Sequence, residues 1–144
     1  MSQFNAEWHP GSIQDNTASS SSKTFVVPDR NYYQYIGVKV VYTTNATVGD
    51  RLLTIDAYDE SNNLLFKTFA GINQAASLTY YYYFNPSNPY FTATTNAQLL
   101  STLPLMILKR AQYIKVYDSN TIDPSGSGEN MLVTVNFLSR RVAL

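Results

Sequence analysis

From Thr24 to the end of the chain, apolar and polar residues alternate with a period of two, which is typical of β-strands that bury one face. The clearest alternating runs are residues 35–44, 51–58, 64–69, 77–84, 113–118 and 131–139, with a shorter apolar run at 105–108. In the first run, the face expected to be buried carries Ile36, Val38, Val40 and Tyr42, and the other face carries Tyr35, Gly37, Lys39 and Thr43. The pattern predicts a protein built mainly from strands.

The segments between these runs have the composition of turns. Asn45–Asp50 contains Gly49, which can adopt a positive φ angle at little cost, and Asp59–Asn63 is rich in polar residues that form hairpin turns. Asn85–Pro89 holds two prolines, which cannot donate to a strand ladder. One short helix is predicted, over Asn96–Ser101.

About eight short strands joined by turns favour an all-β, two-sheet β-sandwich, and the strand number favours the jelly-roll type over the immunoglobulin type. We expect this sandwich to span residues 24–144. Residues 1–23 are expected to form an extended N-terminal arm, because the stretch Asn16–Lys23 is polar and of low complexity. Three large apolar residues of this arm are expected to order on a partner: Phe4, Trp8 and Ile13.

The chain carries little charge. Its 144 residues include ten basic and ten acidic ones, so that 14% are charged, where about 25% is usual. A formal net charge of zero favours association between proteins, and it provides no attraction for nucleic acid or for an anionic membrane. No segment approaches the roughly 20 apolar residues of a membrane span, and the first residues lack the pattern of a signal peptide. We therefore expect neither nucleic acid nor a membrane as a partner.

Residues suited to catalysis or to metal binding are few. Cysteine is absent, which excludes disulfides, thiolate metal sites and a cysteine nucleophile. The single histidine, His9, falls in the predicted arm, where nothing fixes a nucleophile beside it. Asp118–Asp123 begins like a calcium loop, but Ile122 stands where an oxygen ligand is required. We expect no enzymatic activity, no catalytic residue, no cofactor and no metal ion.

Four consecutive tyrosines, Tyr80–Tyr83, lie within one predicted strand. Alternation places Tyr80 and Tyr82 toward the core and places Tyr81 and Tyr83 on the outer face. Three interpretations of the outer pair remain open: cross-strand packing alone, an aromatic protein–protein interface, and a stacking platform for a sugar. The residues predicted to form an interface are Phe4, Trp8, Ile13, Tyr81 and Tyr83.

Several stretches of the chain resemble one group of proteins. They are Ala46–Leu53, Asp59–Phe66, Ala70–Ser77 with the aromatic strand after it, Asn85-Pro86, Leu103–Leu105 and Ala111–Asp118. Across roughly residues 35–138 the pattern resembles small, largely uncharacterised virion structural proteins of tailed bacteriophages. The resemblance implies a virion component, either a capsid decoration (cement) protein or a connector or tail accessory. The group often has glycine where this chain has Asn62, Asn63 and Gln112.

The hypothesis that combines these observations is a capsid decoration (cement) subunit of a phage virion. Such a subunit would bind the major capsid protein or other virion proteins, and it would stabilise the shell. It would form a homo-oligomer, for example a trimer, and would join the virion in the host cytoplasm. The alternatives are a head–tail connector or tail accessory protein, and a carbohydrate-binding β-sandwich module.

Overall fold

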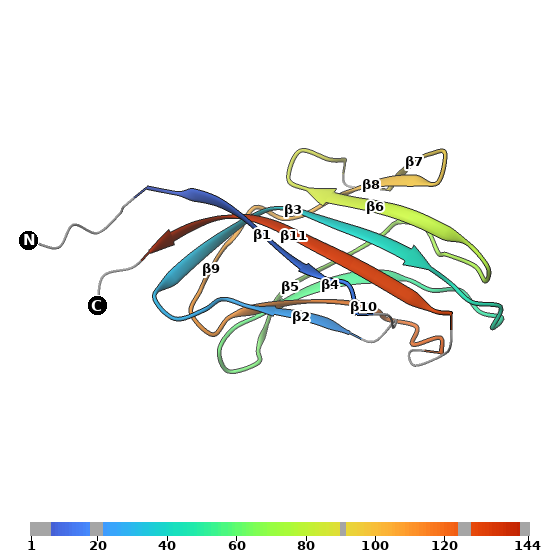
Figure 1. Ribbon diagram of the computed structural model, residues 1–144, viewed down its shortest axis with the longest axis horizontal. Helices are drawn as coiled ribbons and strands as arrows, with labels where there is room; N and C mark the ends of the chain where they lie inside the picture. The colour runs from blue at the N-terminus through green and yellow to red at the C-terminus, as the bar shows by residue number, and fades with distance from the viewer. Residues whose placement is uncertain (1–6, 18–21, 90–91, 124–127, 142–144) are drawn as a thin grey trace, which may run out of the picture.

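The computed structural model describes residues 7–17, 22–89, 92–123 and 128–141, and the regular secondary structure in these ranges is all β-strand (Figure 1). The strands are β1 (His9–Asp15), β2 (Lys23–Val26), β3 (Asn31–Thr43), β4 (Leu53–Tyr58), β5 (Leu64–Phe69), β6 (Thr79–Asn85), β7 (Ala93–Thr95), β8 (Gln98–Thr102), β9 (Ile107–Lys109), β10 (Tyr113–Asp118) and β11 (Asn130–Arg141). Within the described ranges there is no helix of the length and apolarity needed to cross a membrane.

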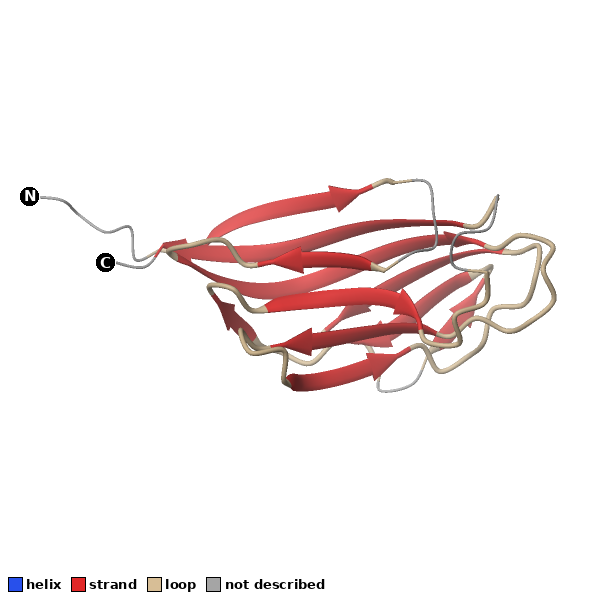
Figure 2. Ribbon diagram, turned by 90° about the horizontal axis from the view of Figure 1, so that it is seen from below, coloured by secondary structure: helices blue, strands red, loops and turns tan. Residues whose placement is uncertain are grey.

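The strands form two sheets that pack face to face (Figure 2). The larger sheet has the order β1-β11-β3-β6-β8-β7, with β9 pairing with β3 as well, and the smaller sheet has the order β2-β10-β4-β5. When β7, β8 and β9 are set aside, the eight remaining strands, counted along the chain, form sheets of order 1-8-3-6 and 2-7-4-5. This interleaving of two Greek keys is the jelly roll. The predicted all-β, two-sheet sandwich of jelly-roll type is therefore confirmed.

The core lies between the sheets and is filled by the inward-facing residues of the alternating strands. The larger sheet contributes Val38, Val40, Tyr42, Tyr82, Phe84, Met131, Val133 and Val135, and the smaller sheet contributes Leu53, Ile55, Ala57, Ile114 and Val116. Each large aliphatic side chain buried in this way contributes about 1.5–3 kcal/mol to folding. The period-two pattern of the sequence thus produces the two-layered core.

A β-bulge in β3 changes which residues of this strand face the core. In the ladder with β11, Tyr35 pairs with Phe137 and Gly37 pairs with Asn136, so that Ile36 has no partner. The extra residue shifts the alternation by one position, which leaves Tyr35 1% exposed and Ile36 40% exposed. The prediction that put Ile36 in the core and Tyr35 outside is wrong. The assignment of the residues that follow the bulge is confirmed.

Part of the predicted N-terminal arm belongs to the sandwich. Strand β1 pairs with β11 in antiparallel register, from His9 opposite Ser139 to Asp15 opposite Val133. Asp15 Oδ1 lies 3.5 Å from Nζ of Lys23 on β2, and this contact ties the edge strand to the smaller sheet. The arm predicted over residues 1–23 therefore does not hold for residues 9–15, while residues 1–6 and 18–21 lie outside the described ranges.

The helix predicted over Asn96–Ser101 is wrong, because this segment forms a hairpin. Asn96 and Ala97 have φ angles of 50° and 64°, which suit the tight turn that joins β7 to β8. Strand β8 then runs parallel to β6, with Leu99 buried and Leu100 41% exposed. The short apolar pair fits a helix or a strand equally well in the sequence, and pairing with β6 decides between them.

The turns at Asn62 and Gln112 lack the glycine that is often present in the phage proteins, and the two turns adopt different solutions. Asn62 has a φ angle of 64°, so that asparagine takes the left-handed conformation that glycine adopts freely. At the second turn the left-handed residue is Ala111, with a φ angle of 66°, rather than Gln112. The Gln112 side chain instead accepts a hydrogen bond from the backbone N–H of Lys109 (3.0 Å) and donates one to Glu60 (2.9 Å).

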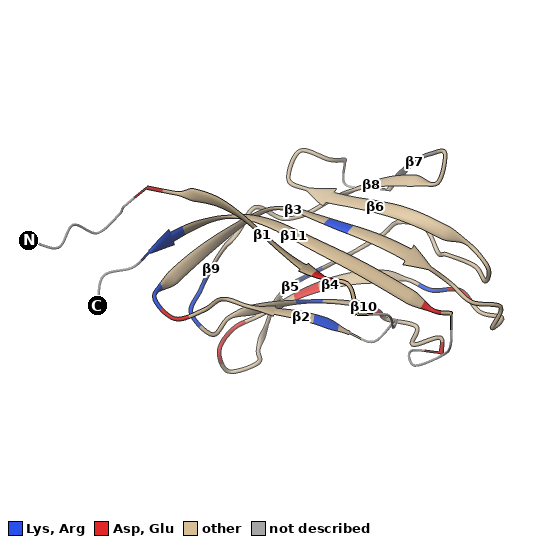
Figure 3. Cartoon of the chain, viewed as in Figure 1, with Lys and Arg blue, Asp and Glu red and all other residues tan. Residues whose placement is uncertain are grey.

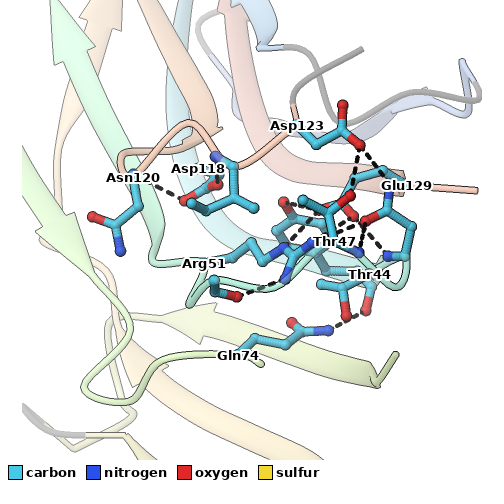
Figure 4. A network of polar contacts seen from close by, with 12 residues as sticks. Thr44, Thr47, Arg51, Gln74, Asp118, Asn120, Asp123 and Glu129 are labelled. Atoms are coloured by element: carbon cyan, nitrogen blue, oxygen red, sulfur yellow. Dashed lines mark hydrogen bonds and ion pairs between the residues drawn. The ribbon is translucent and has the colours of Figure 1, made fainter. Parts of the chain in front are cut away.

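A buried ion pair joins the loops at one end of the sandwich (Figure 4). Arg51 Nε lies 3.0 Å from Glu129 Oε1, and both side chains are 0% exposed. Glu129 also accepts hydrogen bonds from the Tyr42 hydroxyl (2.9 Å) and from the backbone N–H of Asn45 (2.7 Å). Arg51 also donates to the Gly49 carbonyl (2.6 Å) and to Asn45 Oδ1 (3.0 Å). These additional bonds offset the cost of removing two charges from water.

Gln74 extends this network to the loop between β5 and β6. It exchanges two backbone hydrogen bonds of 2.8 Å with Arg51. Its side chain donates to the Tyr42 carbonyl (2.7 Å) and accepts from the Tyr82 hydroxyl (2.9 Å), and the residue is 0% exposed. The loops that precede β4, β6 and β11 are therefore fixed to one another by polar groups inside the fold.

Breaking the buried ion pair should destabilise the protein far more than breaking an exposed one. We expect Glu129→Gln to lower the free energy of unfolding by about 3 kcal/mol, because the Arg51 guanidinium would stay buried without its counter-charge. The control is Arg110→Gln, which removes an exposed contact with Asp29 (3.3 Å) and should cost less than about 1 kcal/mol. Urea unfolding at neutral pH measures both values, and equal costs would contradict the role given to the buried pair.

The buried tyrosines should make the fold sensitive to alkaline pH. Burial raises the pKa of the Tyr35, Tyr42 and Tyr82 hydroxyls above the usual 10.0. Tyrosines of the unfolded chain ionise near pH ~10, so the stability that depends on these neutral hydroxyls is complete below that pH and is lost above it. Absorbance at 295 nm, followed with circular dichroism, should show these groups ionising only as the sandwich unfolds. Ionisation of all 12 tyrosines in the folded protein would contradict this.

Two conservative substitutions should have opposite effects on stability. The Tyr35 hydroxyl is buried and has no hydrogen-bond partner among the described residues. Tyr35→Phe should therefore raise the free energy of unfolding by about 1 kcal/mol, because a buried hydroxyl without a partner is destabilising. Tyr42→Phe removes the bond to Glu129 and should lower it by about 1 kcal/mol. Calorimetry at neutral pH measures the two effects, and a change of the same sign in both variants would refute this account.

Candidate functional site

The outer face of the larger sheet carries the two tyrosines that the alternation placed there. Tyr81 and Tyr83 lie on β6 and point away from the core, whereas the intervening Tyr82 is buried. In the ladder with β3, Tyr81 lies opposite Val41 and Tyr83 lies opposite Lys39. Tyr81 exposes 39% of its surface. The tyrosine pair therefore belongs to a surface shared by central strands of the sheet.

Tyr83 has an outward-facing residue beside it on each neighbouring strand. Lys39 Nζ lies over the ring, 5.9 Å from its centroid. On the other side Tyr83 is in register with Leu100 of β8, whose side chain is 41% exposed. A sugar platform needs an open ring face. The Lys39 ammonium over the ring therefore counts against stacking of a sugar on that face.

The described strands of the larger sheet carry one acidic residue, Asp15 at the end of β1 (Figure 3). It contacts Lys23 of the smaller sheet, so no acidic side chain of these strands lies on the outer face. The outward charged residues of these strands are Lys39, Lys109 and Arg140. Lys109 Nζ lies 3.7 Å from Glu60, whereas Lys39 has no carboxylate within ion-pair distance in the described part of the chain. The centre of the face therefore combines apolar and aromatic side chains with one uncompensated positive charge.

The five residues predicted to form an interface do not gather on one surface. Phe4 lies outside the described residues. Trp8 is half-buried just before β1, and Ile13 of β1 is 37% exposed and lies on the core side of this edge strand. Strands β11 and β3 separate β1 from β6, which corresponds to about 14 Å between these two strands. Only Tyr81 and Tyr83 share the outer face.

The structure adds residues that the sequence interpretation did not assign to an interface. We define the outer patch as Ile36, Lys39, Val41, Tyr81, Tyr83 and Leu100. Alternation had already placed Lys39 on the outer face, and its isolation among neutral residues was the available signal. The alternation predicts Ile36 in the core, and the predicted helix includes Leu100. Neither could be placed before the bulge and the pairing of β8 were known.

The outer face of the smaller sheet has a self-contained polar centre. Asp56 of β4 points outward but is only 1% exposed. Its Oδ2 accepts hydrogen bonds from the hydroxyls of Tyr58 (2.7 Å) and Tyr117 (2.8 Å), and its Oδ1 lies 3.6 Å from Lys67 Nζ. The hydrogen bond to Asp56 raises the pKa of Tyr58 to about 12. Tyr58 also stacks on Tyr113 at 5.1 Å between ring centroids. The side chains of this centre therefore bond mainly to one another.

Asp118, the first residue of the calcium-like stretch, is engaged in structural bonds, and His9 lies on an edge strand. Asp118 accepts hydrogen bonds of 2.9 Å from the backbone N–H groups of Leu52, Asn120 and Ile122, so that it shapes the turn after β10. His9 is exposed at the start of β1. In the described ranges, no group of three or more histidine or acidic side chains is placed to hold a metal ion.

No protein family model matches the chain, and no curated protein sequence matches it. Solved structures show distant likenesses. A chain of the Cocksfoot mottle virus structure is 10% identical with a TM-score of 0.41, and the match covers 96% of this chain and 97% of that one. A chain of Tomato aspermy virus is 13% identical with a TM-score of 0.36, covering 99% and 82%.

The agarase AgWH50C is 9% identical with a TM-score of 0.41, and the match covers 98% of this chain. The chain spans only 22% of the length of that agarase. The likenesses therefore include chains of virus particles and part of an enzyme. At this level they describe a shared all-β architecture, and they bear on neither activity nor partner.

Proposed function

We propose that this chain is a structural subunit, without catalytic activity, that binds other proteins of an assembly through the outer patch. The observation that carries the proposal is the composition of this face: aromatic and aliphatic side chains surround one lysine, and no acidic side chain of the described strands lies on it. Exposed apolar surface rimmed by polar residues is typical of protein–protein contact sites. Tyrosine is also enriched at such sites, because it combines a large apolar ring with a polar tip.

The backbone beneath the outer patch supports this role. Strand β3 lies between β11 and β6, and β6 lies between β3 and β8. Side chains on strands held by two ladders are already ordered before a partner arrives. Binding through them therefore costs less conformational entropy than binding through a loop.

The finer proposal is that the assembly is a phage virion and that the chain is a decoration (cement) subunit on the major capsid protein. The resemblance of its turn and strand motifs to small phage virion proteins supports this assignment. A net charge of zero leaves little repulsion between copies, which supports a homo-oligomer such as a trimer. A head–tail connector or tail accessory is the alternative within this class, and separate binding assays with shells and with tails would distinguish them.

A carbohydrate-binding module is the alternative from another class. The amide side chains of Asn85 and Asn136 near Tyr83 favour it, because amides can bind sugar hydroxyls. The position of Lys39 over the Tyr83 ring counts against it. A glycan array separates the two functions, since the assembly proposal expects no saccharide to bind.

The test of the assembly proposal is a double variant, Tyr81→Ser with Tyr83→Ser. It should keep its unfolding transition, because neither side chain fills the core. It should lose about tenfold or more in affinity, since exposed aromatic residues at the centre of an interface carry much of the binding free energy. Light scattering measures the oligomer, and co-sedimentation with purified virion shells that lack this chain measures shell binding.

The matched control is Tyr113→Ser, on the outer face of the smaller sheet, which should bind shells as the unmodified chain does. Wild-type association by the Tyr81/Tyr83 double variant would refute the role of the outer patch. A saccharide that binds the chain and is lost with the double variant would move the function to the carbohydrate-binding alternative.

A further inference from the structure

The bulge in β3 turns one residue outward in the middle of the larger sheet. Strand β9 pairs with β3 as far as Gln34, and β6 pairs with it from Val38 onward. On the opposite side, the ladder with β11 passes over Ile36. In the described part of the sheet, Ile36 therefore has no register partner on either side. Bulges of this kind commonly re-aim side chains at sites of contact.

A shallow depression of about 310 Å³ lies beside the bulge, and we call it the bulge notch. Its lining includes Ile36, Lys39, Tyr83 and Asn136, together with Gly37, which contributes no side chain. This volume is at the lower end of the range for ligand sites. The notch therefore has room for one or two side chains of an extended segment, and not for a large cofactor.

Two polar side chains of the notch, those of Lys39 and Asn136, have no hydrogen-bond or ion-pair partner in the described part of the chain, whereas Asn85, which also lines it, accepts a hydrogen bond from the Ser87 backbone N–H (3.0 Å). Lys39 has no carboxylate partner among the described residues, and its nearest recorded contact is the Tyr83 ring. The side-chain amide of Asn136 makes no hydrogen bond with any described residue. An ammonium group and an amide N–H both donate to carboxylates, and the charged donor makes the stronger bond. The notch is therefore complementary to a carboxylate.

We propose that the bulge notch receives an aspartate or glutamate side chain carried by an extended segment of the partner protein. The carboxylate binds Lys39 Nζ and the Asn136 amide, and an adjacent apolar side chain of the segment packs on Ile36 and Tyr83. No acidic side chain of the described strands lies on this face, so the positive charge of Lys39 is complementary to such a segment. The inference rests on the proposed function, because it names the chemistry of the partner that the outer patch binds.

Gly37 offers a variant that fills the notch and leaves the strand intact. A Cβ atom at this position would lie 3.6 Å from the Phe84 carbonyl oxygen and 4.0 Å from Asn136 Nδ2, and both are ordinary contacts. Valine is favoured in strands. We therefore expect Gly37→Val to fold normally and to block entry to the notch.

The probe is the capped peptide Ala-Glu-Leu-Glu-Ala, titrated into the isotope-labelled full chain and followed by NMR. Chemical shifts should change at Gly37, Lys39 and the Asn136 side-chain amide. Lys39→Met should weaken binding roughly threefold, as expected for a partly exposed ion pair, and Gly37→Val should abolish it. The matched control is Lys115→Met, because Lys115 also lies over a tyrosine ring, 4.4 Å from the Tyr117 centroid, but on the other sheet. It should leave binding unchanged.

Equal binding of the peptide Ala-Gln-Leu-Gln-Ala, or shift changes away from the notch, would overturn the proposal. Binding of a glucuronate oligosaccharide at the notch without binding of the acidic peptide would also overturn it, and would assign the notch to an acidic sugar. The shell assay separates this inference from the proposed function. If Gly37→Val binds shells normally while the Tyr81/Tyr83 double variant binds them poorly, the role of the notch is rejected and the proposed function is kept. Normal binding by both would reject the proposed function itself.

Discussion

The ion pair between Arg51 and Glu129 is the contact on which the arrangement of the sandwich depends. Both charges are fully buried, and such a pair is tolerated only when each member has several bonding partners. Arg51 lies just before β4 of the smaller sheet and Glu129 just before β11 of the larger one, and the Tyr42 hydroxyl adds β3 to the same network. Apolar burial supplies most of the folding free energy but has no directional preference. The polar network is directional, so it specifies how the loops at this end meet.

With this end fixed, the larger sheet presents its outer face as a rigid surface. The bulge in β3 then gives the surface its local shape, because it turns Ile36 outward and leaves Gly37 beside it without a side chain. Tyr83 and Lys39 border the same place from adjacent strands. The outward Ile36 side chain and the recess beside Gly37 thus lie at one irregularity in one ladder. In a regular strand, Ile36 would face the core.

The outer faces of the two sheets carry the same residue types, but their charged groups are paired differently. On the smaller sheet, tyrosine hydroxyls and Lys67 surround the Asp56 carboxylate, so their polar groups are engaged with one another. On the larger sheet, Lys39 stands beside Tyr83, and no acidic side chain of the described strands lies on that outer face. The two faces therefore differ in charge compensation. A cluster whose charges are already paired gains little binding free energy from a charged partner, whereas an unpaired lysine favours an acidic partner.

The sequence by itself determined the all-β class, most strand positions and the outward direction of Tyr81 and Tyr83, because strand alternation is a local property of the backbone. It also indicated the turns, such as that at Asn62, since left-handed conformations depend on the residue type that adopts them. Only the tertiary structure decided that Ile36 faces outward, that residues 9–15 form an edge strand and that Arg51 is buried opposite Glu129. These features arise from pairing between segments far apart in the chain, and a one-residue shift in such a pairing reverses the face of every side chain beyond it.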